Sequence, residues 1–380
     1  MTAFFLWPAF AACSSIFVPD VSRNARLNST AVVFGLCWCW CLVPFLALAQ
    51  VSGTPEVLSK PDLLGARVVI VQDDQATLAF KVRPERVRQM LERGLTHLTG
   101  QPTPNRAWLS LVSTQDIVGL KVYSKPGPLA GTRPAVVAAA IEGLLAIGLP
   151  PSHIVIWDKN LLDLRAAGFG ELARQYGVEL TSSLSEGWDE SRAYANSSIL
   201  GQLVAGDLEF QRKGEGLGRK SFLSKLLTHR LTRIVNISPL LNNYAAGVAG
   251  NLYGLALGSV DNSLRFENDT GTLVSVVPEI CALEELGDRV ALNIVDALIC
   301  QYEGEVELRL HYATSLNQLR LSKDPVALDV LSVDELTDLR RFRGLDISHY
   351  TNQMRIYRNA SAVWIGVSDA ARISLERVRP

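Results

Sequence analysis

A strand, helix and strand pattern in the first half of the chain constrains the fold most strongly. Residues 116 to 123 read DIVGLKVY, a β-rich run, and residues 132 to 147 read TRPAVVAAAIEGLLAI, a long apolar helical pattern that Thr132 is expected to cap. HIVIWD at residues 153 to 158 then has the pattern of a buried strand. Two strands joined through a helix normally pair in parallel with a right-handed crossover.

The same alternation continues on both sides of this unit. On this scale it predicts an α/β protein with a mainly parallel sheet and crossover helices on both faces. We expect further strands at residues 66–72, 178–181, 233–238, 290–299 and 316–322, and helices at residues 84–98, 164–177 and 243–257 and from Pro325 onward, the last capped by Asp324.

The composition is typical of a folded globular protein that has no net positive charge to attract polyanions. Hydrophobic residues make up 48% of the 380 residues, charged residues make up 20%, and the net charge is -1. We therefore expect no nucleic-acid partner. The predicted organisation is a leader at residues 1–49, the N-terminal part of the α/β domain at 50–115, a core at 116–343 with an irregular excursion at 182–225, and a C-terminal extension at 344–380.

The leader has the pattern of a secretory signal peptide. Residues 31 to 49 carry no charge, follow Arg23 and Arg26, and end in a small-residue motif, Ala47-Leu48-Ala49. Cleavage before Gln50 would give an exported protein, periplasmic or extracellular. An uncleaved membrane anchor is the alternative, because 19 apolar residues can just span a bilayer. Membrane attachment is expected only through such an uncleaved leader.

Cysteine usage excludes one class of cofactor. Only Cys281 and Cys300 follow the leader, too few for a cysteine-ligated iron-sulfur cluster. The cofactor, if the protein has one, is unknown from the sequence. An oxidising compartment would permit a disulfide between these two residues, whereas the apolar run before Cys300 favours a buried free thiol.

Several segments resemble one family in their order along the chain. The segments are VGLKVY, TRPAVVAAAIEGLLAIGLPPSHIVIWDK, RIVNISPLL, AGVAGNLYG, LNIVDALI and SKDPVALDVLSVDEL, and the resemblance covers residues 116 to 336. This order is similar to that of the domain of unknown function 362 family, and the chain resembles its exported, cysteine-poor forms. The family has no settled reaction, so the resemblance implies an α/β fold rather than a chemistry. It adds Asn251 as a candidate for ligand binding.

The chain departs from the family pattern at three places. Members usually carry a lysine and a histidine where this chain has residues 240 to 244, LLNNY. They often place a lysine where Gly250 stands and an asparagine where Tyr123 stands. If the family's chemistry uses those side chains, this protein lacks it.

Polar residues near the predicted strand ends are candidates for a site. In an open α/β sheet, ligands bind where the carboxyl ends of the strands meet loops and helix starts. Lys121, Asp158 and Asp296 are the catalytic candidates, and Asp296 and Asp324 are the metal candidates, because carboxylates are hard ligands. We expect Lys121 and Asp324 to share one edge of the sheet, and Asn236 is a further polar residue at a predicted strand end. The alternative is a helix cap at Asp324 and, for Asp158 and Lys159, a strand end in solvent.

A basic, glycine-rich segment offers a second candidate. In QRKGEGLGRKSFLSK at residues 211 to 225, Gly216 and Gly218 could free backbone amides for an anion while Arg219 and Lys220 add charge. The segment is not a Walker loop, and a solvated surface loop is the alternative.

Two functional hypotheses remain from the sequence. The first is an exported α/β protein with a site for a small anion, or for a metal-assisted reaction, at the carboxyl edge of the sheet. The second is a noncatalytic binding or scaffold protein that keeps the fold. No histidine pair with zinc-motif spacing and no Gly-x-Ser-x-Gly elbow points to a particular enzyme class.

Overall fold

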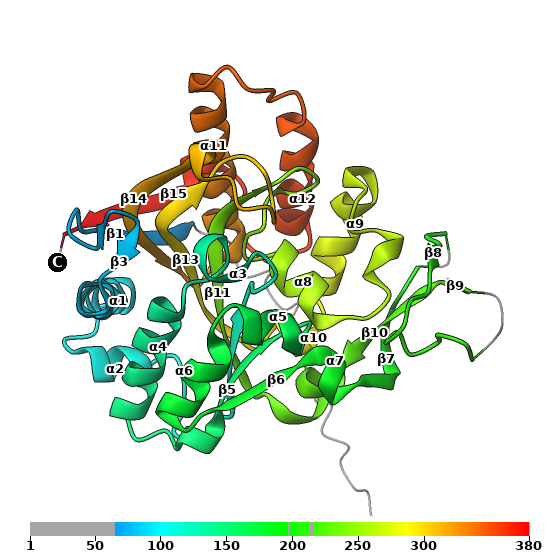
Figure 1. Ribbon diagram of the computed structural model, residues 1–380, viewed down its shortest axis with the longest axis horizontal. Coiled ribbons are helices and arrows are strands. Elements are labelled where there is room, and N and C mark those ends of the chain that lie inside the picture. The colour runs from blue at the N-terminus through cyan, green and yellow to red at the C-terminus, as the bar shows by residue number, and fades with distance from the viewer. Residues whose placement is uncertain (1–64, 197, 213–215, 380) are drawn as a thin grey trace, which may run out of the picture. The chain divides into compact units, whose positions relative to one another are not determined.

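The computed structural model describes residues 65–196, 198–212 and 216–379 (Figure 1). The predicted leader at residues 1–49 and the following residues up to 64 lie outside the described residues. Within the described ranges, no helix is both long enough and apolar enough to cross a membrane.

The described residues fold around one nine-stranded sheet. Its order is β15-β1-β14-β13-β11-β4-β5-β6, with the short β12 paired to β11. The strands are β1 (Ala66–Gln72), β4 (Val118–Val122), β5 (Ile154–Asp158), β6 (Glu179–Ser182), β11 (Arg233–Asn243), β12 (Gly247–Val248), β13 (Val290–Gln301), β14 (Ala313–Ser322) and β15 (Ile373–Val378).

The sheet is mainly parallel, as the sequence predicts. The neighbouring strands from β13 through β11, β4 and β5 to β6 pair in parallel, and so do β1 and β15. Only β14, within this row, runs against both of its neighbours, β13 and β1. Its reversed direction places the carboxyl end of β14 at the amino edge of the parallel strands.

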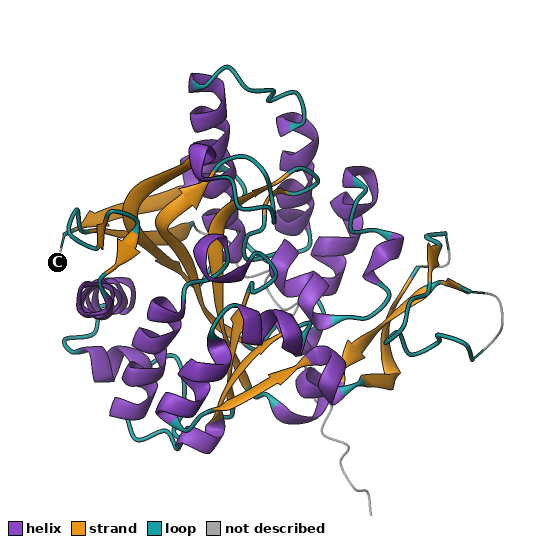
Figure 2. Ribbon diagram, in the orientation of Figure 1, coloured by secondary structure: helices purple, strands orange, loops and turns teal. Residues whose placement is uncertain are grey.

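Helices cover both faces of the sheet, which confirms the expected layers (Figure 2). Even-numbered β4 side chains such as Leu120 face one apolar core, and the odd-numbered Lys121 faces the other, because successive strand residues point to opposite faces. The first core is covered by α1 (Pro84–Thr99), α2 (Pro104–Leu109), α4 (Pro134–Ala146), α5 (Leu161–Ala166) and α6 (Phe169–Tyr176). The second is covered by α8 (Tyr253–Ser259), α9 (Thr270–Cys281), α10 (Glu284–Gly287), α11 (Pro325–Phe342) and α12 (Tyr350–Ala362).

Three expected helix features differ in the structure. Thr132 does not cap α4: its hydroxyl donates to the carbonyl of Ile237, so it ties the loop to β11 instead. The helix expected at 164–177 is broken into α5 and α6 at Gly168, whose φ of 90° lies in the left-handed region. The helix expected at 243–257 is shorter, because β12 takes up its first part and α8 begins only at Tyr253.

The segment at 182–225 is more regular than expected. After α7 (Ser183–Glu186), β7 (Trp188–Ala195) pairs with β10 (Lys220–Ser224), and β8 (Gly201–Gln202) pairs with β9 (Leu217–Gly218). The buried Arg265 holds this segment to the body, since its guanidinium donates to the Ser221 hydroxyl and to four backbone carbonyls, those of Tyr194, Asn196, Ile199 and Arg219. The excursion is therefore a small β unit that Arg265 helps to fix to the body.

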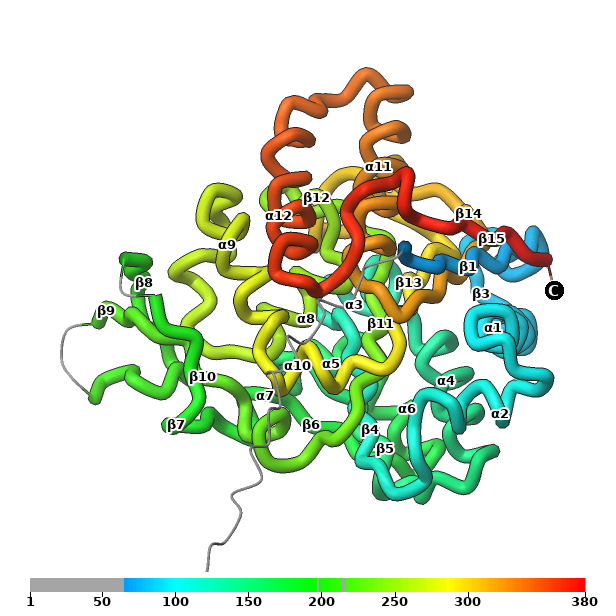
Figure 3. The backbone as a smooth tube through the Cα atoms, turned by 180° about the vertical axis from the view of Figure 1, so that it is seen from behind, coloured from blue at the N-terminus to red at the C-terminus, as the bar shows by residue number. Residues whose placement is uncertain are grey.

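The C-terminal residues join the same sheet. Seen from behind, α11 and α12 lie side by side, and β15 runs along β1 (Figure 3). Cys281 and Cys300 are both free thiols and buried, as the apolar run before Cys300 indicates. Burial raises the pKa of both thiols, Cys300 to about 12, so neither is reactive as a thiolate at neutral pH. The remaining short elements are β2 (Thr77–Leu78), β3 (Lys81–Val82), α3 (Gly127–Ala130) and the single turns Pro151–His153, Leu226–Arg230, Ser263–Arg265, Leu310–Tyr312 and Ala370–Arg372.

Candidate active site

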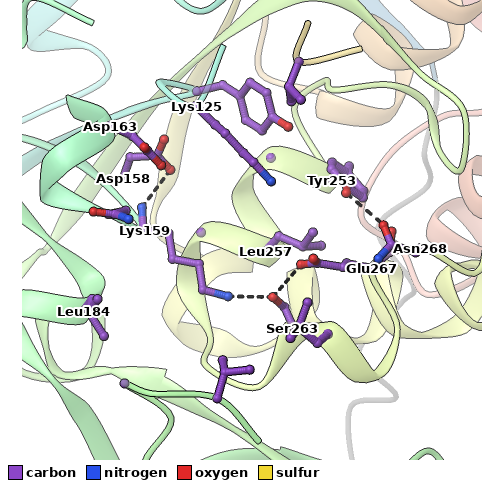
Figure 4. A pocket seen from close by; sticks show the side chains of 18 of the residues that line it. Lys125, Asp158, Lys159, Asp163, Leu184, Tyr253, Leu257, Ser263, Glu267 and Asn268 are labelled. Carbon is purple, nitrogen blue, oxygen red and sulfur yellow. Dashed lines mark hydrogen bonds between the residues drawn. The ribbon is translucent and has the colours of Figure 1, made fainter. Parts of the chain in front are cut away.

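A pocket of about 410 Å³ lies at the carboxyl edge of the parallel strands (Figure 4). It is lined by Tyr123 and Lys125 after β4, by Lys159 and Asn160 after β5, and by Asn243 at the end of β11. Its volume falls within the range of small-molecule sites, and its place is the one where open α/β sheets bind ligands.

One acidic residue of the lining, Asp158, is held in a buried ion pair with Lys121. The Lys121 ammonium lies 2.9 Å from Oδ1 of Asp158, and the two side chains are only 1% and 10% exposed. The other oxygen of Asp158 accepts hydrogen bonds from the backbone NH and the hydroxyl of Ser124, at 2.8 and 2.7 Å. Asp158 therefore ties the loop after β4 to the end of β5 and shapes the pocket.

A glycine in α8 makes room for this pair. A Cβ placed on Gly258 would lie 2.4 Å from Cε of Lys121 and 3.3 Å from Oδ1 of Asp158. Both contacts are closer than ordinary van der Waals distances, so α8 approaches the pair only because residue 258 has no side chain.

A second lysine reaches the pocket itself. Nζ of Lys159 donates to the hydroxyl of Ser263 at 2.6 Å, and that hydroxyl donates to Oε2 of Glu267 at 2.8 Å (Figure 4). Burial lowers the pKa of Lys159, against the opposing effect of Glu267 and other carboxylates nearby. The three side chains form a hydrogen-bonded chain along one wall.

Lys125 contributes the other cationic side chain of the lining. It is exposed and extends into the pocket from the loop after β4 (Figure 4). Among the described residues it has no hydrogen-bond or ion-pair partner. Burial raises the pKa of Asp163 and of Glu305, and Lys125 partly opposes both shifts, so its charge acts on this side of the pocket.

The excursion supplies the facing wall. Leu184, Trp188 and Asp207 line it, and the indole NH of Trp188 donates to the carbonyl of Gly206 at 2.6 Å. Behind this wall, Asp261 accepts hydrogen bonds from the backbone NH groups of Leu208 and Phe222, at 2.8 and 2.6 Å. Burial raises the pKa of Asp261 to about 6.

The tyrosines that line the pocket are neutral at physiological pH. Burial raises the pKa of Tyr123 well above its usual value, and burial also raises that of Tyr253. Both phenols therefore remain protonated and serve as hydrogen-bonding and apolar surface.

The structure separates Lys121 from Asp324, so the expected shared edge is wrong. In the register of the sheet, Lys121 of β4 pairs with Asn236 of β11. Asn236 also pairs with Asn293 of β13, and Asn293 pairs with Ser322 of β14. Because β14 is antiparallel, Asp324 continues toward the amino edge, with β11 and β13 between it and β4. Its carboxylate caps α11 by accepting from the NH of Ala327 and also accepts from the NH of Val367.

Asp296 belongs to a different ion pair from Asp158. Its carboxylate pairs with the Arg133 guanidinium at 3.0 Å and accepts the Arg133 backbone NH, also at 3.0 Å, on the face opposite Lys121. In the described part of the chain, no three His, Cys, Asp or Glu residues come together as a group that could hold a metal ion. The structure therefore does not join Asp296 and Asp324 in one metal site.

Asn236 and Asn251 belong to a buried polar network. The Asn236 amide donates to the carbonyl of Asn251 at 2.9 Å, and Asn251 donates from its backbone NH and its side chain to Oδ1 of Asp329, at 2.7 and 2.9 Å. The other oxygen of Asp329 accepts the NH of Leu252. Asn251 is completely buried and lies outside the pocket lining, so its contacts here are structural.

The basic glycine segment lies apart from the pocket, and part of it, residues 213–215, lies outside the described residues. Gly218 packs against Asn262, where a Cβ would lie 2.1 Å from Nδ2, while Arg219 and Lys220 are exposed. Gly216 has a φ of 65°. None of these four residues lines the pocket at the carboxyl edge.

Of the candidate residues named from the sequence, Asp158 lines the pocket, whereas Lys159, Ser263 and Glu267 were not predicted to face it. Lys159 follows Asp158 directly. Because this strand end could be interpreted as lying in solvent, Lys159 was not named as a site residue. Ser263 and Glu267 gave no signal, because they lie in a short turn and loop about a hundred residues downstream. The available signal was position alone: a lysine directly after a buried strand.

Comparison with solved structures shows distant structural similarity, including to the following protein. A structural-genomics crystal structure of a Thermotoga maritima protein is 12% identical with a TM-score of 0.36, and the match covers 70% of this chain. The chain matches only 60% of the length of that protein. No family model matches the sequence, and no curated protein matches it.

Proposed function

We propose that the protein binds a small anionic organic molecule in the pocket at the carboxyl edge of the sheet. The observation that carries the proposal is the placement of two lysine side chains, Lys125 and Lys159, in the lining of a cavity of about 410 Å³. A carboxylate or phosphate group of the ligand would pair with these lysines.

Most of the acidic residues of the lining are already bonded to neighbouring groups, and one of them, Asp207, accepts the backbone NH groups of Val204 and Asn262. Asp158 is neutralised by Lys121, and Glu267 is bonded to Lys159 through Ser263. Burial raises the pKa of Asp163 and of Glu305, and Lys125 partly opposes both shifts. Their carboxyl groups and the Tyr253 phenol would instead bond to hydroxyl groups of the ligand. The preferred ligand is therefore a small hydroxy acid or a sugar phosphate.

The proposal is one of binding, and it applies equally to an enzyme and to a noncatalytic binding protein. Of the two kinds of site that the sequence suggested at this edge, the proposal retains the site for a small anion and does not include the metal-assisted reaction. The apolar segment at 31 to 49, with the small-residue motif that ends it, supports the further proposal that binding takes place outside the cytosol.

Native mass spectrometry of protein purified from its own compartment tests the proposal. We expect a retained small molecule, or else binding of lactate, malate, citrate or glycerol phosphate when these are added singly. Lys125→Gln should weaken that binding, and Lys220→Gln, which changes an exposed lysine outside the pocket, should not. A protein that retains nothing and binds none of these anions would overturn the proposal.

A further inference from the structure

The chain of hydrogen bonds from Lys159 to Glu267 suits a reaction at the lysine amine. The ammonium donates to Ser263, and Ser263 donates to Glu267, so a proton leaving Nζ can pass to the Ser263 oxygen while the Ser263 proton passes to the carboxylate. The product is a neutral amine beside a cavity. Burial of Lys159, which disfavours the charged ammonium, acts in the same direction.

We propose that Lys159 reacts as a nucleophile with the carbonyl group of a small 2-oxo acid and forms an imine in this pocket. The inference rests on the proposed function, because the carboxylate of the 2-oxo acid is the anion that the pocket would bind. It names the substrate class for that site and the atom that reacts.

The reaction balances without a redox partner. The lone pair of Nζ attacks the carbonyl carbon, the carbon–oxygen π bond breaks, and the oxygen takes a proton to give a carbinolamine. The carbon–oxygen bond then breaks, a carbon–nitrogen double bond forms, and one water leaves with the second proton of the amine. The Ser263 and Glu267 pair can accept and return the protons of both steps.

Other lysines near the pocket do not offer the same arrangement. Lys121 is completely buried and bonded to Asp158 and to the Val122 carbonyl, so a substrate carbonyl cannot reach it. Lys125 lines the pocket but is exposed, and in the described part of the chain it has no hydrogen-bonded relay to a carboxylate. Lys125 suits the carboxylate of the substrate, and Lys159 suits its carbonyl.

Reductive trapping tests the inference. The full protein is incubated with glyoxylate, pyruvate or 2-oxoglutarate and sodium cyanoborohydride, and the modified lysines are mapped by peptide mass spectrometry. With pyruvate, we expect one carboxyethyl group on Lys159, formed about tenfold faster than on the exposed Lys220, since the bound carbonyl is held beside the amine. Lys159→Arg should remove this fast phase, and Ser263→Ala should slow it, because the relay from Nζ to Glu267 is then broken.

The outcomes separate this inference from the proposed function. If the oxo acids bind by calorimetry but Lys159 and Lys220 are modified at the same rate, the imine is excluded and the binding site stands. If the oxo acids do not bind but lactate, malate, citrate or glycerol phosphate does, only the imine is excluded. If none of these anions binds and no small molecule is retained, both proposals fail. If Lys159→Arg does not fold, the ratio of modification at Lys159 and Lys220 in the unmodified sequence still decides.

Discussion

Nζ of Lys159 lies 2.6 Å from the hydroxyl of Ser263, although 104 residues separate them in the sequence. The contact joins the loop after β5 to the short turn after α8, across the carboxyl edge of the sheet. It therefore links the pocket to both the parallel core and the segment that follows α8.

Removal of Lys121 should destabilise the protein rather than act on ligand chemistry. Lys121→Met leaves the Asp158 carboxylate buried without its cationic partner, which typically costs about 3 kcal/mol or more. Urea denaturation of Lys121→Met, Asp158→Asn and the double variant measures the coupling between them. We expect the double variant to be more stable than the sum of the single changes predicts. Strict additivity would show that the pair is not coupled.

The buried Asp329 should make stability depend on pH. Burial raises its pKa from 3.8 to about 6, so the folded state holds this proton more tightly than the unfolded state. Its contribution is complete below pH 4 and is lost as the pH rises through about 6, by roughly 3 kcal/mol in total.

The Asp329→Asn variant isolates that contribution, because asparagine does not titrate. Denaturation of both proteins between pH 4 and 7 should give a free energy of unfolding that falls with pH more steeply for the natural sequence. Parallel curves for the two proteins would contradict the raised pKa.

Asp324 should behave as a structural residue. Asp324→Ala removes the acceptor for the NH groups of Ala327 and Val367, so we expect a loss of about 1 to 2 kcal/mol in the free energy of unfolding. Affinity for ligands of the pocket should stay the same, because Asp324 lies at the opposite edge. A large loss of ligand affinity in a folded variant would restore the idea of a site shared with Lys121.

The leader prediction is tested by amino-terminal sequencing of the exported protein. We expect the mature chain to begin at or next to Gln50, because Ala47-Leu48-Ala49 matches the small-residue cleavage motif. Recovery of residues 31 to 49 with the protein in the membrane fraction would indicate an anchor instead.

The sequence predicted the strands of the sheet better than their directions. Apolar runs such as HIVIWD and VALNIVDALI show that a strand is buried, and those strands formed as expected. Periodicity does not record direction, however, and the reversal of β14 alone moved Asp324 to the other edge. The partners of Lys159 were hidden for a related reason, because the contact depends on how distant segments pack rather than on local spacing.

The most direct test of the central claim is the affinity of the pocket for a small hydroxy acid, measured by calorimetry at pH 7. Malate should bind the natural sequence and the Lys220→Met control with the same affinity. In Lys159→Met the affinity should fall by about tenfold or more, as expected for the loss of one charge-assisted hydrogen bond, with an almost unchanged melting temperature. Equal affinity of all three proteins, or no binding by any of them, would contradict the assignment of this pocket as the functional site.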